Sequence, residues 1–149
     1  MTSRLGSVDD LGITAAQLVP PSQTGLPWSL IYSAWQDAPP GSEVPIHPSD
    51  PSATPNSTLQ LDFASASIAS DMAGYRSRIF RAHSDDGHTF DSSECILQGS
   101  GHHTDGVDSV HAEDMSIIDI GHERYRMYYA ACDRYGCWRI ASAVCEGHP

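Results

Sequence analysis

The sequence predicts an all-β protein made of two copies of one antiparallel unit. Runs rich in aromatic and β-branched residues recur along the chain and are separated by Gly, Pro and Asp, a pattern typical of short strands and turns. Residues 30–34, Leu-Ile-Tyr-Ser-Ala, correspond to residues 127–131, Met-Tyr-Tyr-Ala-Ala, and residues 78–82 correspond to residues 139–143. Repeated meanders indicate β-propeller blades. We therefore predict two antiparallel four-stranded-type blades of an incomplete β-propeller, the second lacking its last strand.

The first blade-like unit is expected at residues 12–97 of a single partial propeller domain, 1–149. A mixed run at 12–19 ends at two prolines and predicts one strand. The aromatic run at 28–35 predicts a buried strand. A clearer strand follows at 75–82, and a short outer strand is expected at 94–97.

A long insertion is expected to interrupt the first unit at residues 37–74. Six of the ten prolines fall between positions 39 and 55, among serines and acids, which is a loop signature. Residues 59–73 are weakly apolar, and both a strand and one or two turns of helix remain open for them.

The second blade-like unit is expected at residues 111–146. Its first strand starts at His111 and ends at a turn around Gly121, a second strand is expected at 124–132, and a third at 138–144.

Strand direction predicts which loops share one end of the sheet. Because a meander reverses at each turn, the start of the second unit lies at the same end as the insertion and the loop 98–110. That end should gather Glu113, Asp114, His111, Asp108, Trp35 and Asp37. The turn at Asp86-Gly87 lies at the opposite end and is interpreted as scaffold, since Asp-Gly supplies the positive φ that a hairpin needs.

Two motifs resemble one group of enzymes. Residues 113–118 and 124–129 resemble the Glu-Asp-Pro and Gly-x-Tyr-Tyr-x-x-Tyr segments of five-bladed β-propeller glycoside hydrolases, namely the arabinanase/β-xylosidase, invertase-like and mannoside-phosphorylase-like families. Ser84-x-Asp86-Gly87-x-Thr89-Phe90 matches a turn common in the same families. The resemblance covers residues 28–146 apart from the insertion. Met115 stands where those families have Pro, and a five-bladed propeller needs roughly twice this length.

The resemblance implies hydrolysis, or related processing, of glycosidic bonds in oligo- or polysaccharides. Glycoside hydrolysis uses two carboxyl groups across the scissile bond, and the family pattern implies that Asp114 lies in the central site. Glu113 is the second candidate, but adjacent strand residues point to opposite faces. The candidate substrate-binding residues are His111, Asp108, Trp35, Asp37 and Arg76.

Alternatives remain open for the acids and for the function. Glu113 and Asp114 could instead pair with arginines such as Arg76 or Arg126. The further catalytic carboxylates are not visible, so the isolated chain is expected to show little or no hydrolase activity. The alternative function is a non-catalytic carbohydrate-binding or assembly module, in which Asp114 only hydrogen-bonds sugar hydroxyls.

Composition limits the partners. The formal net charge is −11, from 19 acids against 8 arginines and no lysine, so nucleic acid and anionic membranes are not expected. Neither a signal peptide nor a membrane span is visible, which favours a cytoplasmic chain and leaves secretion open if the true N-terminus is missing. Two blades leave apolar faces uncovered, so we expect further blades of the same protein, or self-association and poor solubility.

No cofactor is expected. His102, His103, Asp105, Asp108 and His111 are of metal-binding type without a recognised spacing, so a solvated loop is favoured and a central cation stays open. Cys132 and Cys137 flank a short loop and could face each other across a hairpin. The favoured alternative is two reduced thiols.

Overall fold

The chain folds into seven β-strands. The computed structural model describes residues 12–37, 75–90, 92–101, 104–133 and 136–149. The all-β prediction is confirmed, and every strand expected in these ranges is present, with several extended by about two residues at one end. The strands are β1 (Gly12–Val19), β2 (Trp28–Asp37), β3 (Tyr75–Ser84), β4 (Ser92–Leu97), β5 (His111–Gly121), β6 (Arg124–Cys132) and β7 (Trp138–Glu146). The expected insertion, including residues 59–73, lies almost wholly outside the described residues.

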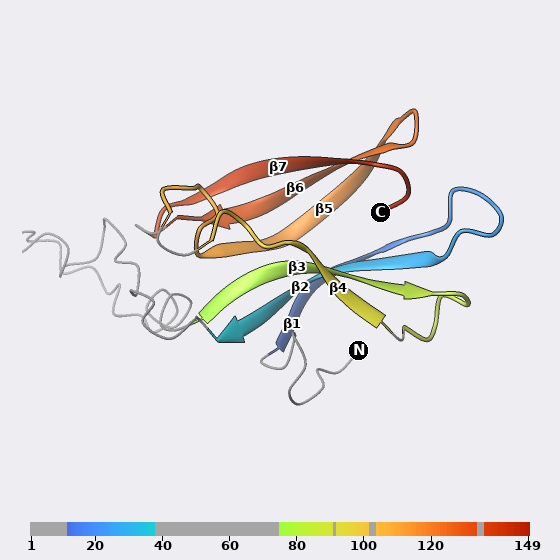
Figure 1. Ribbon diagram of the computed structural model, residues 1–149, viewed down its shortest axis with the longest axis horizontal. Helices are drawn as coiled ribbons and strands as arrows, with labels where there is room; N and C mark the ends of the chain where they lie inside the picture. The colour runs from blue at the N-terminus through green and yellow to red at the C-terminus, as the bar shows by residue number, and fades with distance from the viewer. Residues whose placement is uncertain (1–11, 38–74, 91, 102–103, 134–135) are drawn as a thin grey trace, which may run out of the picture.

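The strands form two antiparallel meanders joined at one place. The order across the sheet is β1-β2-β3-β5-β6-β7, with β4 paired to β3. β3 and β5 run parallel and share a single register pair, Ser77 and His111. Figure 1 shows the β1–β4 meander as one layer and the β5–β7 meander as the layer above it. The strand bounds therefore place the start of β5 at the end of the sheet where β2 stops and β3 begins.

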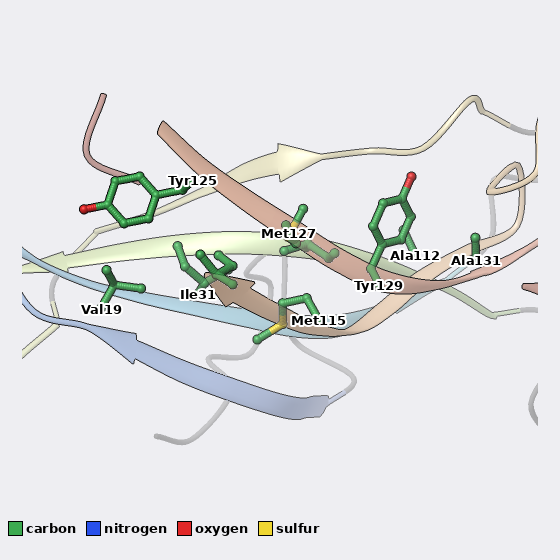
Figure 2. Packing of buried hydrophobic residues seen from close by; sticks show 10 residues of the cluster. Val19, Ile31, Ala112, Met115, Tyr125, Met127, Tyr129 and Ala131 are labelled. Atoms are coloured by element: carbon green, nitrogen blue, oxygen red, sulfur yellow. The ribbon is translucent and has the colours of Figure 1, made fainter. Parts of the chain in front are cut away.

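The two layers bury a shared hydrophobic core. Figure 2 shows Val19 and Ile31 of the first meander facing Met115, Met127 and Tyr125 of the second. Burying a large apolar side chain contributes about 1.5–3 kcal/mol, so this interface is a main source of stability. The remaining members of the core are Ile79, Ala112, Ile117, Tyr129 and Ala131.

The first meander is also buried on its other face. Tyr32 and Phe80 stack there with ring centroids 5.7 Å apart, together with Ala34 and Ala82. β2 and β3 are thus covered on both sides, which explains why their sequences lack a strict two-residue alternation.

A glutamine side chain ties the first strands of the two meanders together. The Gln17 amide donates to the Ile117 carbonyl at 2.8 Å and accepts from the Ile117 N–H at 2.8 Å. This side chain bonds the β5 backbone much as a neighbouring strand would. It therefore fixes where β1 lies along β5.

The Asp-Gly turn satisfies its own polar groups. Asp86 accepts from the N–H groups of Thr89 and His88 and from the Ser84 hydroxyl, each at 2.8 Å. These bonds lower the Asp86 pKa to about 2. Gly87 has φ 75°, and a Cβ there would lie 3.0 Å from the Trp28 ring, so Trp28 packs on the turn.

The loop before β5 is closed by a glycine. Gly99 has φ 68°, and a Cβ on it would lie 2.2 Å from the Asp108 carbonyl oxygen. Gly101 also has a positive φ, 86°, but nothing lies within 4 Å of its Cβ position. Both glycines have a left-handed backbone, but only Gly99 has no room for a side chain. Comparing substitutions at the two positions therefore separates the cost of backbone strain from the cost of a steric clash.

Gly99→Ala is expected to destabilise the chain far more than Gly101→Ala. Left-handed backbone costs an alanine about 1–2 kcal/mol at either position, and only Gly99→Ala adds a backbone clash, for a total of roughly 3 kcal/mol or more. Urea unfolding of both variants measures the difference. Equal losses would show that the loop does not pack as described.

Candidate functional site

A row of side chains crosses both meanders at the end of the sheet where β5 begins. Register pairs connect β2 to β3, β3 to β5, β5 to β6 and β6 to β7 at this level. Aromatic rings alternate along the row with small side chains, which leaves room for the rings to lean toward one another. The row is Trp35, Ser77, His111, Cys132 and Trp138.

His111 lies between the two tryptophans. Its ring is fully buried and stacks on Trp138, with centroids 5.3 Å apart and an interplanar angle of 14°. Trp35 lies 6.1 Å away and is tilted by 46°. Trp138 remains 40% exposed, so it presents part of a flat apolar surface to solvent.

The protonation state of His111 follows from its hydrogen bond. His111 Nδ1 accepts from the Ser77 N–H at 3.1 Å, and the Ser77 hydroxyl lies 3.1 Å from the same nitrogen. A nitrogen that accepts carries no proton. His111 is therefore the neutral tautomer with its proton on Nε2.

Arg78 holds the chain that enters β5. One of its terminal nitrogens donates to the Ser77 carbonyl at 2.7 Å and to the Val110 carbonyl at 2.8 Å. Burial, and then the charge of Arg76, lower the Arg78 pKa to about 10. The side chain stays protonated at neutral pH, so two charge-assisted bonds fix Val110 beside Ser77.

Asp108, a predicted substrate-binding residue, anchors its own loop. Tyr129 donates to one carboxylate oxygen at 2.8 Å, and the Ser100 N–H and hydroxyl donate to the other. Burial by itself would raise the Asp108 pKa, but these bonds outweigh it and hold the pKa below its usual range. Burial and the bond to Asp108 raise the Tyr129 pKa. Both oxygens of Asp108 are engaged within the chain.

The two candidate catalytic acids have different surroundings. Glu113 is buried, 9% exposed, and is paired with Ala130 on the side of the strand that carries His111. Asp114 is exposed and has φ 51°. It lies where the β5–β6 register shifts between Glu113 and Ser116, and its N–H donates to the Ser33 hydroxyl at 2.9 Å. A β-bulge therefore directs Asp114, in place of the simple alternation that the sequence suggests.

The other predicted site residues lie at the same end of the sheet. Arg76 is paired with Gln36, and its Nε has no hydrogen-bond partner among the described residues. Asp37 is the last residue of β2, and its side chain lies outside the described part of the structure. Asp114 forms no ion pair with an arginine in the described residues.

Ser77, Arg78 and Trp138 are not among the residues expected from the sequence. Trp138 could have been found by extending the expected pairing of the second unit from His111, whereas Ser77 is reached only through the β3–β5 pair, which the sequence does not indicate. Nothing in the sequence signals that Arg78 would reach the Val110 carbonyl, because that contact needs the position of the loop 98–110.

The β6–β7 turn carries a buried carboxylate. Asp133 accepts from the Cys137 N–H at 3.0 Å and pairs with Arg139, and this pairing raises the Arg139 pKa. Cys132 is paired with Trp138 in the register, and Cys137 lies in the turn just before β7, so the two cysteines are not register partners. All four cysteines are free thiols. Burial, and then the charge of Asp133, raise the Cys132 pKa to about 12, which makes this thiol a poor nucleophile.

An apolar hollow lies away from the row. It has a volume of about 180 Å³ between the two layers, on the side of β4 and β7. No predicted site residue lines it. Its lining includes Ile96, Leu97, Ile117, Met127, Ala143 and Cys145.

The described residues contain neither a metal-binding cluster nor a membrane-spanning helix. Among the described residues, no group of three His, Cys, Asp or Glu side chains could hold a metal ion, and His102 and His103 lie outside those residues. The described residues contain no helix long and apolar enough to cross a membrane. Comparisons with family models, curated proteins and solved structures found no match to the chain.

The site combines one exposed acid with a partly exposed aromatic surface. Asp114 can accept hydrogen bonds from hydroxyl groups, and Trp138 can pack against an apolar ring face. Glu113 and Asp114 are consecutive residues of one strand, so they cannot flank a glycosidic bond from two sides as hydrolysis requires. Asp114 and Trp138 could therefore bind a ligand that carries hydroxyl groups and an apolar ring face, whereas hydrolysis of a glycosidic bond needs another carboxyl group.

Tyr129→Phe tests the network behind the site. It removes a hydrogen bond to a buried carboxylate and should cost about 1.5–3 kcal/mol at neutral pH. Tyr128→Phe on the same strand, at an exposed position, should cost less than about 0.5 kcal/mol. Urea unfolding at several pH values measures both.

The penalty for Tyr129→Phe should shrink in acid. The folded-state pKa of Asp108 is depressed, so its contribution is complete above the unfolded pKa and is lost as the pH falls through the folded value. A penalty independent of pH down to that range would contradict the Tyr129–Asp108 bond.

Proposed function

We propose that the chain forms part of a glycoside-processing β-propeller that acts on oligo- or polysaccharides, with Asp114 as the carboxylate it contributes. The observation that carries this proposal is the backbone of Asp114. An exposed acid with φ 51° on a β-bulge adopts a conformation that is uncommon for residues with a side chain and that Asp tolerates better than most. Bulges and strained residues gather at functional sites, where they aim side chains.

The packing of the two meanders supports the propeller part of the proposal. In the repeat, residues 30–34 correspond to residues 127–131, so Ile31 is equivalent to Tyr128, and Tyr32 to Tyr129. Ile31 packs in the core with Tyr129 and Met127, whereas Tyr128 is 42% exposed. The meanders thus pack front to back, as successive blades of a ring do. β1 and β5, the first strand of each, are tied together by Gln17.

A non-catalytic carbohydrate-binding module is the second candidate. The observations that favour it are the partly exposed Trp138 surface, stacked on His111, and the exposed Asp114 carboxylate on β5. Both candidates require sugar binding. They differ in whether the complete protein hydrolyses the sugar. The enzyme needs further carboxylates from residues outside the described ones, and the binding module does not.

Asp114→Asn is expected to weaken glycan binding by the chain about tenfold, since a hydrogen bond to a charged group contributes about 1.5–3 kcal/mol. Asp119→Asn is the matched control, because Asp119 is an exposed acid near the other end of β5. Ligand-observed NMR with a panel of pentose and hexose oligosaccharides measures binding, and a reducing-sugar assay measures turnover.

Two outcomes would contradict the proposal. Equal binding by both variants would remove Asp114 from the site. No binding of any oligosaccharide by the unmodified chain would remove the carbohydrate assignment. Robust hydrolysis by the isolated chain would instead favour the glycoside-processing candidate over the binding module, and would contradict only the expectation that the second catalytic carboxyl group lies outside these 149 residues.

A further inference from the structure

The β5–β7 meander has a second face that the first meander does not cover. Register pairs place Ile118, Arg126 and Val144 in one row across the three strands, and Ser116, Tyr128 and Ser142 in the next. Ala130 and Ile140 follow, and then Cys132 and Trp138. We call the large apolar side chains of these rows the outer face: Ile118, Tyr128, Trp138, Ile140 and Val144.

The outer face is the largest gathering of exposed apolar side chains in the described part of the chain. Ile140 is 76% exposed and the other four are 40–49% exposed. The remaining exposed large hydrophobics of the described residues are spread over β1, the β1–β2 turn, β4 and the loop before β5; they are Leu18, Leu26, Ile96 and Val107. Scattered exposed side chains are ordinary on protein surfaces, whereas a contiguous patch marks an interaction site.

The size of the patch matches what a small dimer needs. An aromatic side chain buries about 150–250 Å² when fully covered; the three aliphatic side chains are smaller but include the most exposed of the five, Ile140, so together the five expose on the order of 500 Å². Two such faces would bury about 1,000 Å² or more, the lower limit for a specific interface. In a second copy, this same face is the large apolar surface available for contact.

We propose that the outer face binds the outer face of a second copy of this chain, so that two chains pack about a twofold axis. Each surface meets itself in such an isologous interface. Large side chains alternate with small ones across the strands: Tyr128 lies between Ser116 and Ser142, and Ile140 lies beside Ala130. Rotation of one face against the other can therefore seat large side chains over small ones. The proposal does not depend on the role of Asp114, but the dimer covers Trp138 and therefore competes with sugar stacking on that side chain.

The net charge of the chain predicts that added salt strengthens this dimer. Arg126 lies between Ile118 and Val144, so twofold packing also brings the Arg126 guanidiniums of the two copies near each other, while each chain carries −11. Two acidic chains repel each other, and salt screens that repulsion over a Debye length of about 8–10 Å near physiological ionic strength. Added salt therefore strengthens an apolar interface here, whereas it would weaken one held by ion pairs.

Sedimentation velocity of the full chain across the micromolar range tests the proposal. The expected result is a monomer–dimer equilibrium that shifts toward dimer as sodium chloride is raised. Ile140→Asp should weaken dimerisation by roughly a hundredfold or more, because the symmetric interface would bury two unpaired carboxylates. Val107→Asp, at a 44% exposed position outside the outer face, should leave dimerisation unchanged.

Circular dichroism of both variants checks that the fold is intact, which the exposure of Ile140 and Val107 leads us to expect. A monomer at every concentration and salt level would overturn the proposal and favour a different β-meander as the natural cover of this face. Equal effects of the two substitutions, or dimerisation that weakens with salt, would also overturn it.

Discussion

The hydrogen bond between the Ser77 N–H and His111 Nδ1 is the contact on which the arrangement of the two meanders depends. β3 and β5 share one register pair, so no ladder of backbone bonds joins the layers there. Arg78 reinforces this narrow joint by holding Val110. Beyond His111, β5 runs across the first meander, and its residues Ala112, Met115 and Ile117 pack in the core between the two layers. A single neutral histidine thus links β3 of the first meander to the aromatic row of the second.

Much of the fold could be predicted from the sequence because its signals are local. Aromatic and β-branched runs specify strands, Asp86-Gly87 specifies a turn, and the repeat specifies two meanders with their loops at the expected ends. The two-sided burial of Tyr32 and Phe80 explains why no strict alternation was seen. The front-to-back packing could not be predicted, since it depends on which faces meet.

The candidate site was predictable in place but not in detail. Chain reversal alone brings Trp35, His111 and Asp114 to one end of the sheet. The simple alternation used for Glu113 and Asp114 takes no account of the bulge, because an extra residue in one strand leaves no clear mark in the sequence. Asp108 looked like a ligand-binding acid, yet Tyr129 and Ser100 engage it, a contact between residues distant in sequence. Ser77 and Arg78 gave no chemical signal before the β3–β5 joint was known.

The tautomer of His111 shows whether the two meanders are joined through Ser77. Long-range proton–nitrogen correlation spectra of the ¹⁵N-labelled chain report which ring nitrogen carries the proton. The structure predicts a proton fixed on Nε2 and an unprotonated Nδ1 that accepts from the Ser77 amide. A proton on Nδ1, or a ring that averages both tautomers as solvent-exposed histidines do, would contradict the joint between the two meanders.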